Sequence, residues 1–498
     1  MYRRSTLGQL SFENFYLPFG GKLSGENRWV KLAALIPWDK FEAEYAEQLS
    51  EGMGAPAKSF RMALGALIIK ERLGTSDAET VEQIRENPYL QFFLGLSEYS
   101  DSAPFDSSMF VHFRKRLTLD LVGRINEAIV LPCQEQSKSE IPANGDDSEQ
   151  DEDDDDEPPP NQGQLILDAS CAPGDIRYPT DLSLLNEARE ATEAIIDLLY
   201  EQVRTAVPYK PRTYRQEARK EYLSVTKQRK ARGKTMRKAI RKQLGYIKRN
   251  LAHLDALVEA GATLSALDKS LYRKLLVIAE LYRQQQSMYD QRQHRIEHRI
   301  VTLAQPHIRP IVRGKAGTPV EFGAKFSASC VDGNVFLDRL SWDNFNESGD
   351  FTTQVEQFKQ RFGHYPESVH ADQIYRTRAN RAFCRELGIR LSGKPLGRPK
   401  AQDAAEIRKQ VRADAAVRNQ IEGKFGQGKR RFSLGRVMAK LAPTAECTIA
   451  ITFLVMNLER WLQHLLFVFF VVLFWLKDGC ELHRTPRQPE QEQFAISS

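Results

Sequence analysis

Residues 164–168 read Gln-Leu-Ile-Leu-Asp, a short apolar run that ends in a carboxylate. A run of this length predicts a buried β-strand. Residues 367–372, Glu-Ser-Val-His-Ala-Asp, repeat the pattern and end in Asp372. In open α/β sheets, sites are built at the edge where the carboxyl ends of the strands lie. The two stretches therefore predict a sheet that presents Asp168 and Asp372 at one edge.

The chain around these strands predicts the rest of the sheet. Alternating apolar residues over 320–326 and 335–340 flank Asp332-Gly333, which predicts a β-hairpin. After the hairpin the pattern predicts a helix over residues 353–362, a strand over 367–372 and a helix that ends before Gly388. A strand over 389–391 and a long helix over about 403–431 follow. This order is that of an RNase H-like α/β fold, which we expect over residues 164–181 and 306–460.

Residues 182–305 interrupt this order and are almost wholly helical in pattern, which predicts a helical insertion in the α/β domain. Within it, residues 210–249 hold sixteen Lys or Arg against two Glu. Apolar residues recur every seven positions near its end, as in a helix pair or coiled coil: Leu275, Tyr282, Tyr289 and Ile296. The basic stretch predicts a polyanionic partner, and the alternative is a solvated helix face.

The first 140 residues predict an all-helical N-terminal domain. Helices are expected over residues 60–73, from Ser76 to Ile84, and from Ser107 to Leu117, where the last carries three consecutive cations. Such helices are compatible with helix-turn-helix DNA binding or dimerisation, and equally with any small helical domain. Residues 141–163, with ten carboxylates in the twelve positions 146–157 and then three prolines, predict an acidic, Pro-rich linker.

Residues 461–498 predict an apolar helix and a polar tail. The twelve apolar positions from Leu465 to Leu476 are few for a membrane span, so we expect a buried or interface helix, with a membrane anchor as the alternative. The six cysteines have no metal-ligand spacing and predict no disulfide framework. No signal peptide is recognisable, and a reducing, cytoplasmic setting fits best.

Three carboxylates form the candidate reactive centre. Cleaving and rejoining DNA requires two divalent cations beside the attacked phosphorus, and Mg²⁺ prefers carboxylate oxygens. Asp168 and Asp372 end strands, and Glu422 lies on the last long helix, which could pack against the same edge. Arg418 and Lys429 fall within roughly 40° of Glu422 on the helical wheel, so that a carboxylate and two cations share one face. The alternative for Arg418 and Glu422 is an ordinary surface ion pair.

Several blocks resemble bacterial insertion-sequence transposases of the large superfamily named after insertion sequences four and five. Residues 168–171 and 175–181, continued by 184–189, resemble the first-aspartate block of that group. Later blocks resemble the same group, at residues 313–315, 345–348, 370–377 and 393–399. The resemblance covers most of residues 30–460 and is weakest in the acidic linker and the last forty residues.

These transposases share a pattern around the catalytic glutamate: Tyr, two residues, Arg, three residues, Glu, six residues, Lys. Arg418, Glu422 and Lys429 match it, whereas Ala415 stands at the tyrosine position and puts in doubt any contact that the tyrosine supplies. The resemblance implies that Asp168, Asp372 and Glu422 are the catalytic, metal-binding residues of a DDE transposase with two Mg²⁺ or Mn²⁺ ions. It also implies that Arg418 and Lys429 contact DNA near the cleavage site.

The resemblance further implies which partners the chain has. They would be double-stranded DNA, as terminal inverted repeats and target DNA, and a second copy of the chain in a homodimer, without a membrane. The setting would be the bacterial cytoplasm, at the nucleoid. Two alternatives stay open: a DNA-binding protein that has lost catalysis, and a structure-specific nuclease on the same fold.

Three other motifs are set aside. His294 and His298 flank Glu297 at an inverted zinc-protease spacing, on what the pattern predicts to be a helix, but no further ligand stands nearby. Asp175 and Asp181 follow Asp168 closely, and a turn and a helix cap are their expected roles. Cys171 has no evident activating histidine, so we expect a buried thiol.

Overall fold

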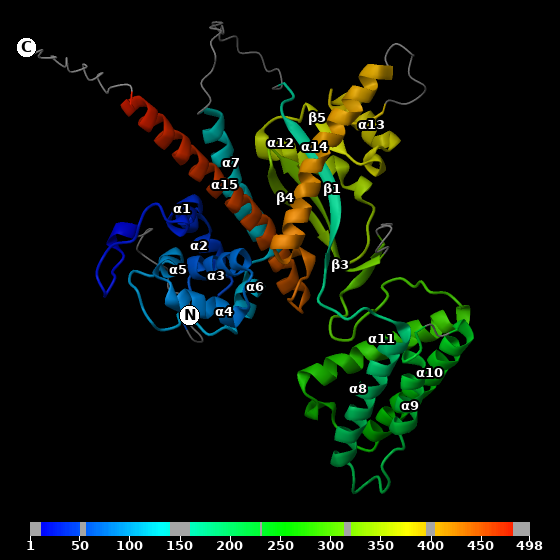
Figure 1. Ribbon diagram of the computed structural model, residues 1–498. Coiled ribbons are helices and arrows are strands. Elements are labelled where there is room, and N and C mark those ends of the chain that lie inside the picture. The colour runs from blue at the N-terminus through cyan, green and yellow to red at the C-terminus, as the bar shows by residue number, and fades with distance from the viewer. Residues whose placement is uncertain are drawn as a thin grey trace, which may run out of the picture.

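The computed structural model describes residues 11–49, 56–139, 160–229, 232–312, 320–394 and 404–481. Most of the predicted acidic linker lies outside these residues. So do the block at 313–315 and most of the block at 393–399. Helices and strands combine into a mixed α/β fold, with a helical bundle on either side of the sheet (Figure 1).

Six strands form one mixed sheet. Its order is β2 (Arg309–Val312), β3 (Val320–Val331), β1 (Gln164–Pro173), β5 (Ser368–Ala371) and β6 (Arg390–Leu391), and β4 (Asn334–Ser341) also pairs with β3. β1 is antiparallel to β3 and parallel to β5, and β6 is parallel to β5. The predicted hairpin is confirmed, with Asp332 at φ 48° and Gly333 at φ 75°. The short strand β2 was not predicted.

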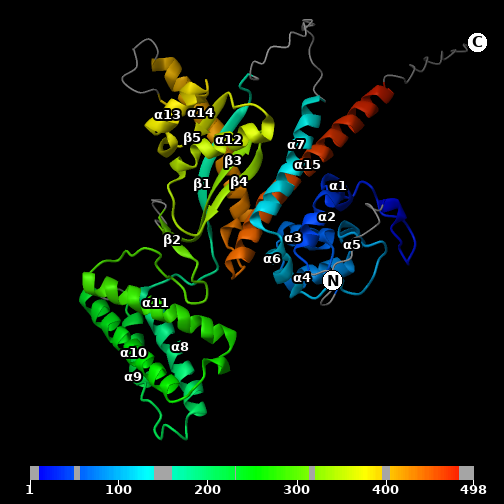
Figure 2. The same cartoon turned by 180° about the vertical axis from the view of Figure 1, so that it is seen from behind.

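The two faces of the sheet pack against different helices. On one face, Leu167 and Val369 join a core with α12 (Phe351–Phe362) and with Cys384 of α13 (Arg378–Glu386), both visible from behind in Figure 2. On the other face, Ile166 and Phe326 join a core with α14 (Ala404–Arg431) and α15 (Ala442–Glu481). The predicted helices around residues 353–362, before Gly388 and over 403–431 are thereby confirmed.

The N-terminal helices share that second core. They are α1 (Arg28–Leu35), α2 (Trp38–Glu47), α3 (Phe60–Leu73), α4 (Asp77–Glu86), α5 (Pro88–Phe93), α6 (Met109–Arg116) and α7 (Leu119–Ser139). The predicted helices α3, α4 and α6 are confirmed, with Gly74 capping α3 at φ 67°. On the basic helix α6, Arg114 is buried and ion-paired with Asp77 of α4, at 2.5 Å.

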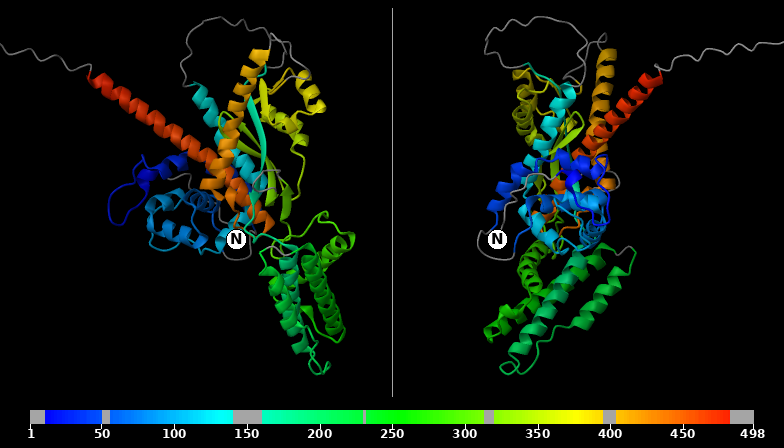
Figure 3. Two further views of the ribbon diagram at one scale, coloured as in Figure 1. Left: turned by 45° about the vertical axis from the view of Figure 1, so that its right-hand side comes forward. Right: turned by 90° about the vertical axis from the view of Figure 1, so that its left-hand side faces the viewer.

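The insertion is a helical bundle with its own cores. Its helices are α8 (Asp181–Gln202), α9 (Arg215–Thr226), α10 (Gly233–Glu259) and α11 (Lys269–Gln291). They project beyond the end of the sheet where Figure 2 labels β2, and they are the green helices at the bottom of both views of Figure 3. The expectation of helix as far as residue 305 is wrong. α11 ends at Gln291 because Arg292 adopts a left-handed conformation and its N–H bonds back to the Met288 carbonyl. His294 and His298 therefore do not lie on one helix face.

The C-terminal helix α15 is buried along its first half. Phe453, Leu454, Trp461 and Leu462 are all less than 5% exposed. α15 runs beside α7 in the views of Figures 1 and 2. In the part of the chain that the structure describes, no helix combines the length and apolarity needed to cross a bilayer.

Candidate active site

The sheet brings Asp168 and Asp372 next to each other. In the parallel pair of β1 and β5, Leu167 lies opposite Ala371, and the two aspartates are the next residues along. Neighbouring strands lie about 4.8 Å apart. One expectation was wrong: β1 continues beyond Asp168 to Pro173, because antiparallel β3 pairs with it over that length. Asp168 instead stands where its parallel partner β5 ends.

Glu422 reaches this region because α14 is anchored on the sheet. Ile421 and Phe425 are buried, and the Phe425 ring packs against the Phe326 ring at a centroid distance of 5.3 Å. Side chains two positions apart along a strand share a face, so Asp168 lies on the side of Ile166, toward α14. Because the apolar side chains of α14 are buried against the sheet, Glu422 lies at the edge of this contact, with its side chain 55% exposed.

Arg418 connects two of the three predicted carboxylates. Its Nη2 contacts Oδ1 of Asp372, and the same nitrogen lies 3.4 Å from Oε1 of Glu422. Because both oxygens contact one atom, Asp372 and Glu422 are no more than a few ångströms apart. The predicted Arg418–Glu422 pair is present, and the Asp372 contact was not foreseen.

In the described ranges, no group of three or more His, Cys, Asp or Glu side chains is arranged to hold a metal ion. One oxygen of Asp372 and one of Glu422 contact the single positive charge of the Arg418 guanidinium. Asp168 accepts a hydrogen bond from the N–H of Ala169, at 2.7 Å. A two-ion metal centre on these carboxylates therefore stays a prediction.

Lys429 lies away from the three carboxylates. Two turns beyond Glu422 on α14, its ammonium is 3.8 Å from Oε1 of Glu321, near the start of β3. Glu321 is at the end of β3 that pairs with β2, whereas Asp168 pairs at Ala328. The predicted DNA contact of Lys429 is neither shown nor contradicted. Ala415, at the tyrosine position of the family pattern, is exposed.

Asp414 lies beside the site and was not among the residues predicted from the sequence. It is buried on α14, and it accepts hydrogen bonds from the Gly393 N–H at 3.0 Å and from Arg390 at 3.0 Å. Burial alone would raise the pKa of Asp414, but the Gly393 N–H and Arg390 outweigh burial and lower it. His370, just before the site on β5, lies 3.5 Å from the Asp414 carboxylate. Asp414 thus links α14 to β5 and β6. It lies one turn before Arg418, and a helical wheel could have shown that the two residues share a face of α14.

The other end of α14 is tied to the N-terminal helices. Arg431 pairs at 3.0 Å with Glu459 of α15, which also pairs with Arg72 of α3. Glu71 accepts hydrogen bonds from the Ser433 backbone N–H at 2.8 Å and from the Ser433 hydroxyl at 2.6 Å. These partly buried contacts fix the segment after α14, and hence the position of the helix that carries Glu422.

The set-aside residues have structural partners. Asp175 pairs with Arg436, and Asp181 pairs with Arg299 at 2.6 Å. The cap at α8 is Thr180, whose side chain and that of Ser183 form a capping box. Cys171 is fully buried, as expected.

Two regions match known domain families. Residues 369–459, which include Asp372, Arg418, Glu422 and Lys429, match the family described as "Transposase DDE domain". Residues 18–116, with helices α1 to α6, match the family described as "Transposase domain (DUF772)". Both matches bear out the resemblance found in the sequence.

One curated relative is the "Uncharacterized protein ORF8 in nfe locus" of Rhizobium meliloti, which is 38% identical over 88 residues. The matched part makes up 18% of this chain and 42% of the relative, so the chain spans less than half of that relative's length. No solved structure matches the chain.

Proposed function

Since the chain belongs with the DDE transposases of insertion sequences, we propose that it cuts the ends of such an element and joins them to target DNA. The observation that supports this proposal is that three carboxylates from distant parts of the chain lie in one region of the fold. The register of β1 and β5 sets Asp168 beside Asp372, and Arg418 joins Asp372 to Glu422.

The catalytic domain is RNase H-like in this proposal. The strand order β4-β3-β1-β5-β6 supports it, with the first three strands antiparallel and the last two parallel to β1. Helices α12 and α13 connect the later strands in the predicted order, and α14 follows the last strand. The insertion of α8 to α11 lies between β1 and β2.

Asp168, Asp372 and Glu422 would hold Mg²⁺ or Mn²⁺. The donor set fits, because these ions prefer carboxylate oxygens and need only one or two from the protein beside water and phosphate. The Arg418 guanidinium shows that Asp372 and Glu422 can converge on one positive charge. Bound ions would lower the pKa of an attacking water and stabilise the leaving oxygen.

The chain's own residues then orient the DNA. The scissile phosphate would lie over the exposed edge formed by Asp372 and Glu422, whose side chains are 50% and 55% exposed. Arg418, released from the carboxylates, would bind a backbone phosphate beside it, and Lys429, two turns further along α14, would bind a phosphate farther along the duplex. Joining two ends requires two active sites, so the active complex would be at least a homodimer.

The test uses a labelled duplex that carries the inverted repeats flanking the gene, with Mg²⁺ or Mn²⁺. The variants Asp168→Asn, Asp372→Asn and Glu422→Gln are each expected to lose both nicking and strand transfer. Asp175→Asn is the matched control, because Asp175 follows β1 closely but pairs with Arg436. Equal cleavage by wild type and Asp372→Asn would defeat the site assignment. Nicking without strand transfer would favour a nuclease, and binding without cleavage would favour a DNA-binding protein.

A further inference from the structure

Helix α10 carries a row of cations along its outward face. Lys234, Lys238, Arg241 and Lys248 are all exposed, and they fall within an arc of about 80° at 100° per residue. Outside this arc, the helix packs into the bundle through Leu244, Ile247 and other apolar side chains. From Lys234 to Leu254 the helix contains no carboxylate. The cation row therefore has no internal counter-charge on its own helix.

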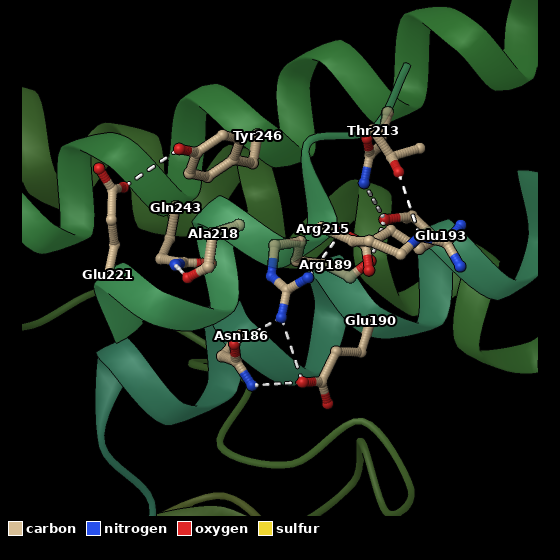
Figure 4. A network of polar contacts seen from close by, with 12 residues as sticks. Asn186, Arg189, Glu190, Glu193, Thr213, Arg215, Ala218, Glu221, Gln243 and Tyr246 are labelled. Carbon is tan, nitrogen blue, oxygen red and sulfur yellow. Dashed lines mark hydrogen bonds and ion pairs between the residues drawn. The ribbon is translucent and has the colours of Figure 1, made fainter. Parts of the chain in front are cut away.

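Neighbouring helices neutralise other cations of the bundle but not this row. Lys242, at the side of the row, pairs with Glu221 of α9, and Arg215 pairs with Asp197 of α8 at 2.7 Å. In Figure 4, Tyr246 donates to Glu221 and Gln243 donates to the Ala218 carbonyl, both on the α9 side of α10. Within the described ranges, the four cations of the row have neither an ion pair nor a hydrogen bond.

Gly245 lies in the middle of the same row, between Arg241 and Lys248. A glycine inside a helix costs about 0.5–1 kcal/mol relative to alanine. The fold does not require it here, because a Cβ at Gly245 would meet no heavy atom within 4 Å. Because Gly245 has no side chain, the helix backbone is exposed at the centre of the row of unpaired cations.

We propose that the outward face of α10 is a docking surface for duplex DNA, separate from the carboxylate site, where Gly245 allows a sugar-phosphate backbone to approach the helix. This inference rests on the proposed function and names the surface that holds the substrate. The row is about 21 Å long from Lys234 to Lys248 at 1.5 Å per residue. It exceeds the major groove width of ~12 Å, so its ends can reach both backbones of a duplex.

Contacts of this kind recognise charge and not sequence. The α10 row would therefore hold any duplex, and sequence recognition of the element ends would come from elsewhere in the chain. A single strand would satisfy only part of the row, because it lacks the second backbone.

The first test measures binding of the full chain to a fluorescent duplex of arbitrary sequence over a salt series. The double variant Lys238→Gln, Arg241→Gln is compared with Lys269→Gln, Arg273→Gln on α11, which removes the same two residue types from the same bundle. Lys269 and Arg273 are exposed, beside Leu271 and Leu275, which pack at the far end of α10. The α10 variant should lower the slope of log affinity against log salt by about 2, at ~0.9 for each lost phosphate contact. The α11 variant should leave the slope within error of wild type.

The second test uses glycine. Gly245→Gln should weaken duplex binding severalfold while the protein keeps its melting temperature, because the new side chain has open space in the free protein. Gly123→Gln is the control: Gly123 is also exposed inside a long helix, α7, with open space around its Cβ. It should not change binding.

The outcomes separate the surface from the proposed function. Equal losses in the α10 and α11 double variants, or unchanged binding by Gly245→Gln, would overturn the docking surface while leaving the transposase proposal intact. A wild-type chain that fails to bind duplex even at low salt would overturn both. Stronger binding to a single strand than to a duplex would overturn the duplex assignment.

Discussion

Arg418 and Asp372 form an ion pair between α14 and the end of β5, and the same guanidinium nitrogen also contacts Glu422. The Arg418 guanidinium thus contacts the carboxylate oxygens that would bind metal ions in the proposed function. It keeps two carboxylates together that would otherwise repel each other. A divalent cation entering the site must displace it.

Replacing Arg418 by Gln should therefore tighten metal binding. Exposed ion pairs contribute about 0.2–1 kcal/mol each, so the affinity for Mn²⁺ should rise by up to about fivefold per pair lost. Titration of Mn²⁺ into the DNA-free protein in a calorimeter measures this affinity without any DNA reaction. Arg412→Gln on the same helix is the control, since Arg412 is exposed and lies a turn and a half away from Arg418. Unchanged or weaker Mn²⁺ binding by Arg418→Gln would show that Arg418 does not compete with the metal.

Asp414 should stabilise the protein in a pH-dependent way. Its pKa is lowered in the folded chain, so its contribution is present above the unfolded pKa and is lost as pH falls through the folded pKa. Asp414→Asn should lower the free energy of unfolding by about 2 kcal/mol at neutral pH, as expected for hydrogen bonds to a charged group. Denaturant unfolding of both proteins should show this difference shrinking below about pH 4, near the ordinary pKa of an aspartate. A difference that is constant down to strongly acidic pH would contradict the ion-pair role.

Glu459 should be required for the seating of the N-terminal helices against α14. Its side chain is 5% exposed and pairs with both Arg72 and Arg431. Glu459→Gln leaves the buried Arg72 without its counter-charge, which should cost about 3–5 kcal/mol of unfolding free energy. Glu82→Gln, which removes an exposed pair with Arg85, should change it by less than about 0.5 kcal/mol. Similar free energies of unfolding for the two variants would show that Glu459 is not required to hold the N-terminal helices against α14.

Gly323 should resist substitution because β1 and β3 approach closely there. A Cβ on Gly323 would stand 2.1 Å from the Ala172 carbonyl oxygen, a backbone atom that cannot move without disturbing the pairing. Gly323→Ala should destabilise the protein by about 3 kcal/mol, at the upper end of overpacking costs. Gly123→Ala should be neutral or stabilising, since its Cβ meets open space. Equal unfolding midpoints for the two variants would show that the strands can separate to admit the methyl group.

Local pattern was enough to predict much of this fold. Apolar runs of strand length placed Asp168 on β1 and Asp372 after β5, and the Asp332-Gly333 turn predicted the β3–β4 hairpin. These features depend on periodicity and turn chemistry within a few residues, which the sequence contains directly. The four-residue β2 was missed because so short a strand has no periodicity and forms only where β3 offers an edge.

Tertiary structure alone decided which charges meet. Helical spacing predicted that Arg418 and Glu422 share a face of α14, but the partner of Arg418 on β5 depends on how α14 lies across the sheet. That position is set by burial of Ile421 and Phe425, by Asp414 in the first half of the helix and by Arg431 at its last residue. The same helix position separates Lys429 from the carboxylates and sets it beside Glu321. The sequence thus determined the candidate acids, whereas packing determined which cation contacts two of them, because contacts between distant residues follow from the burial of whole faces.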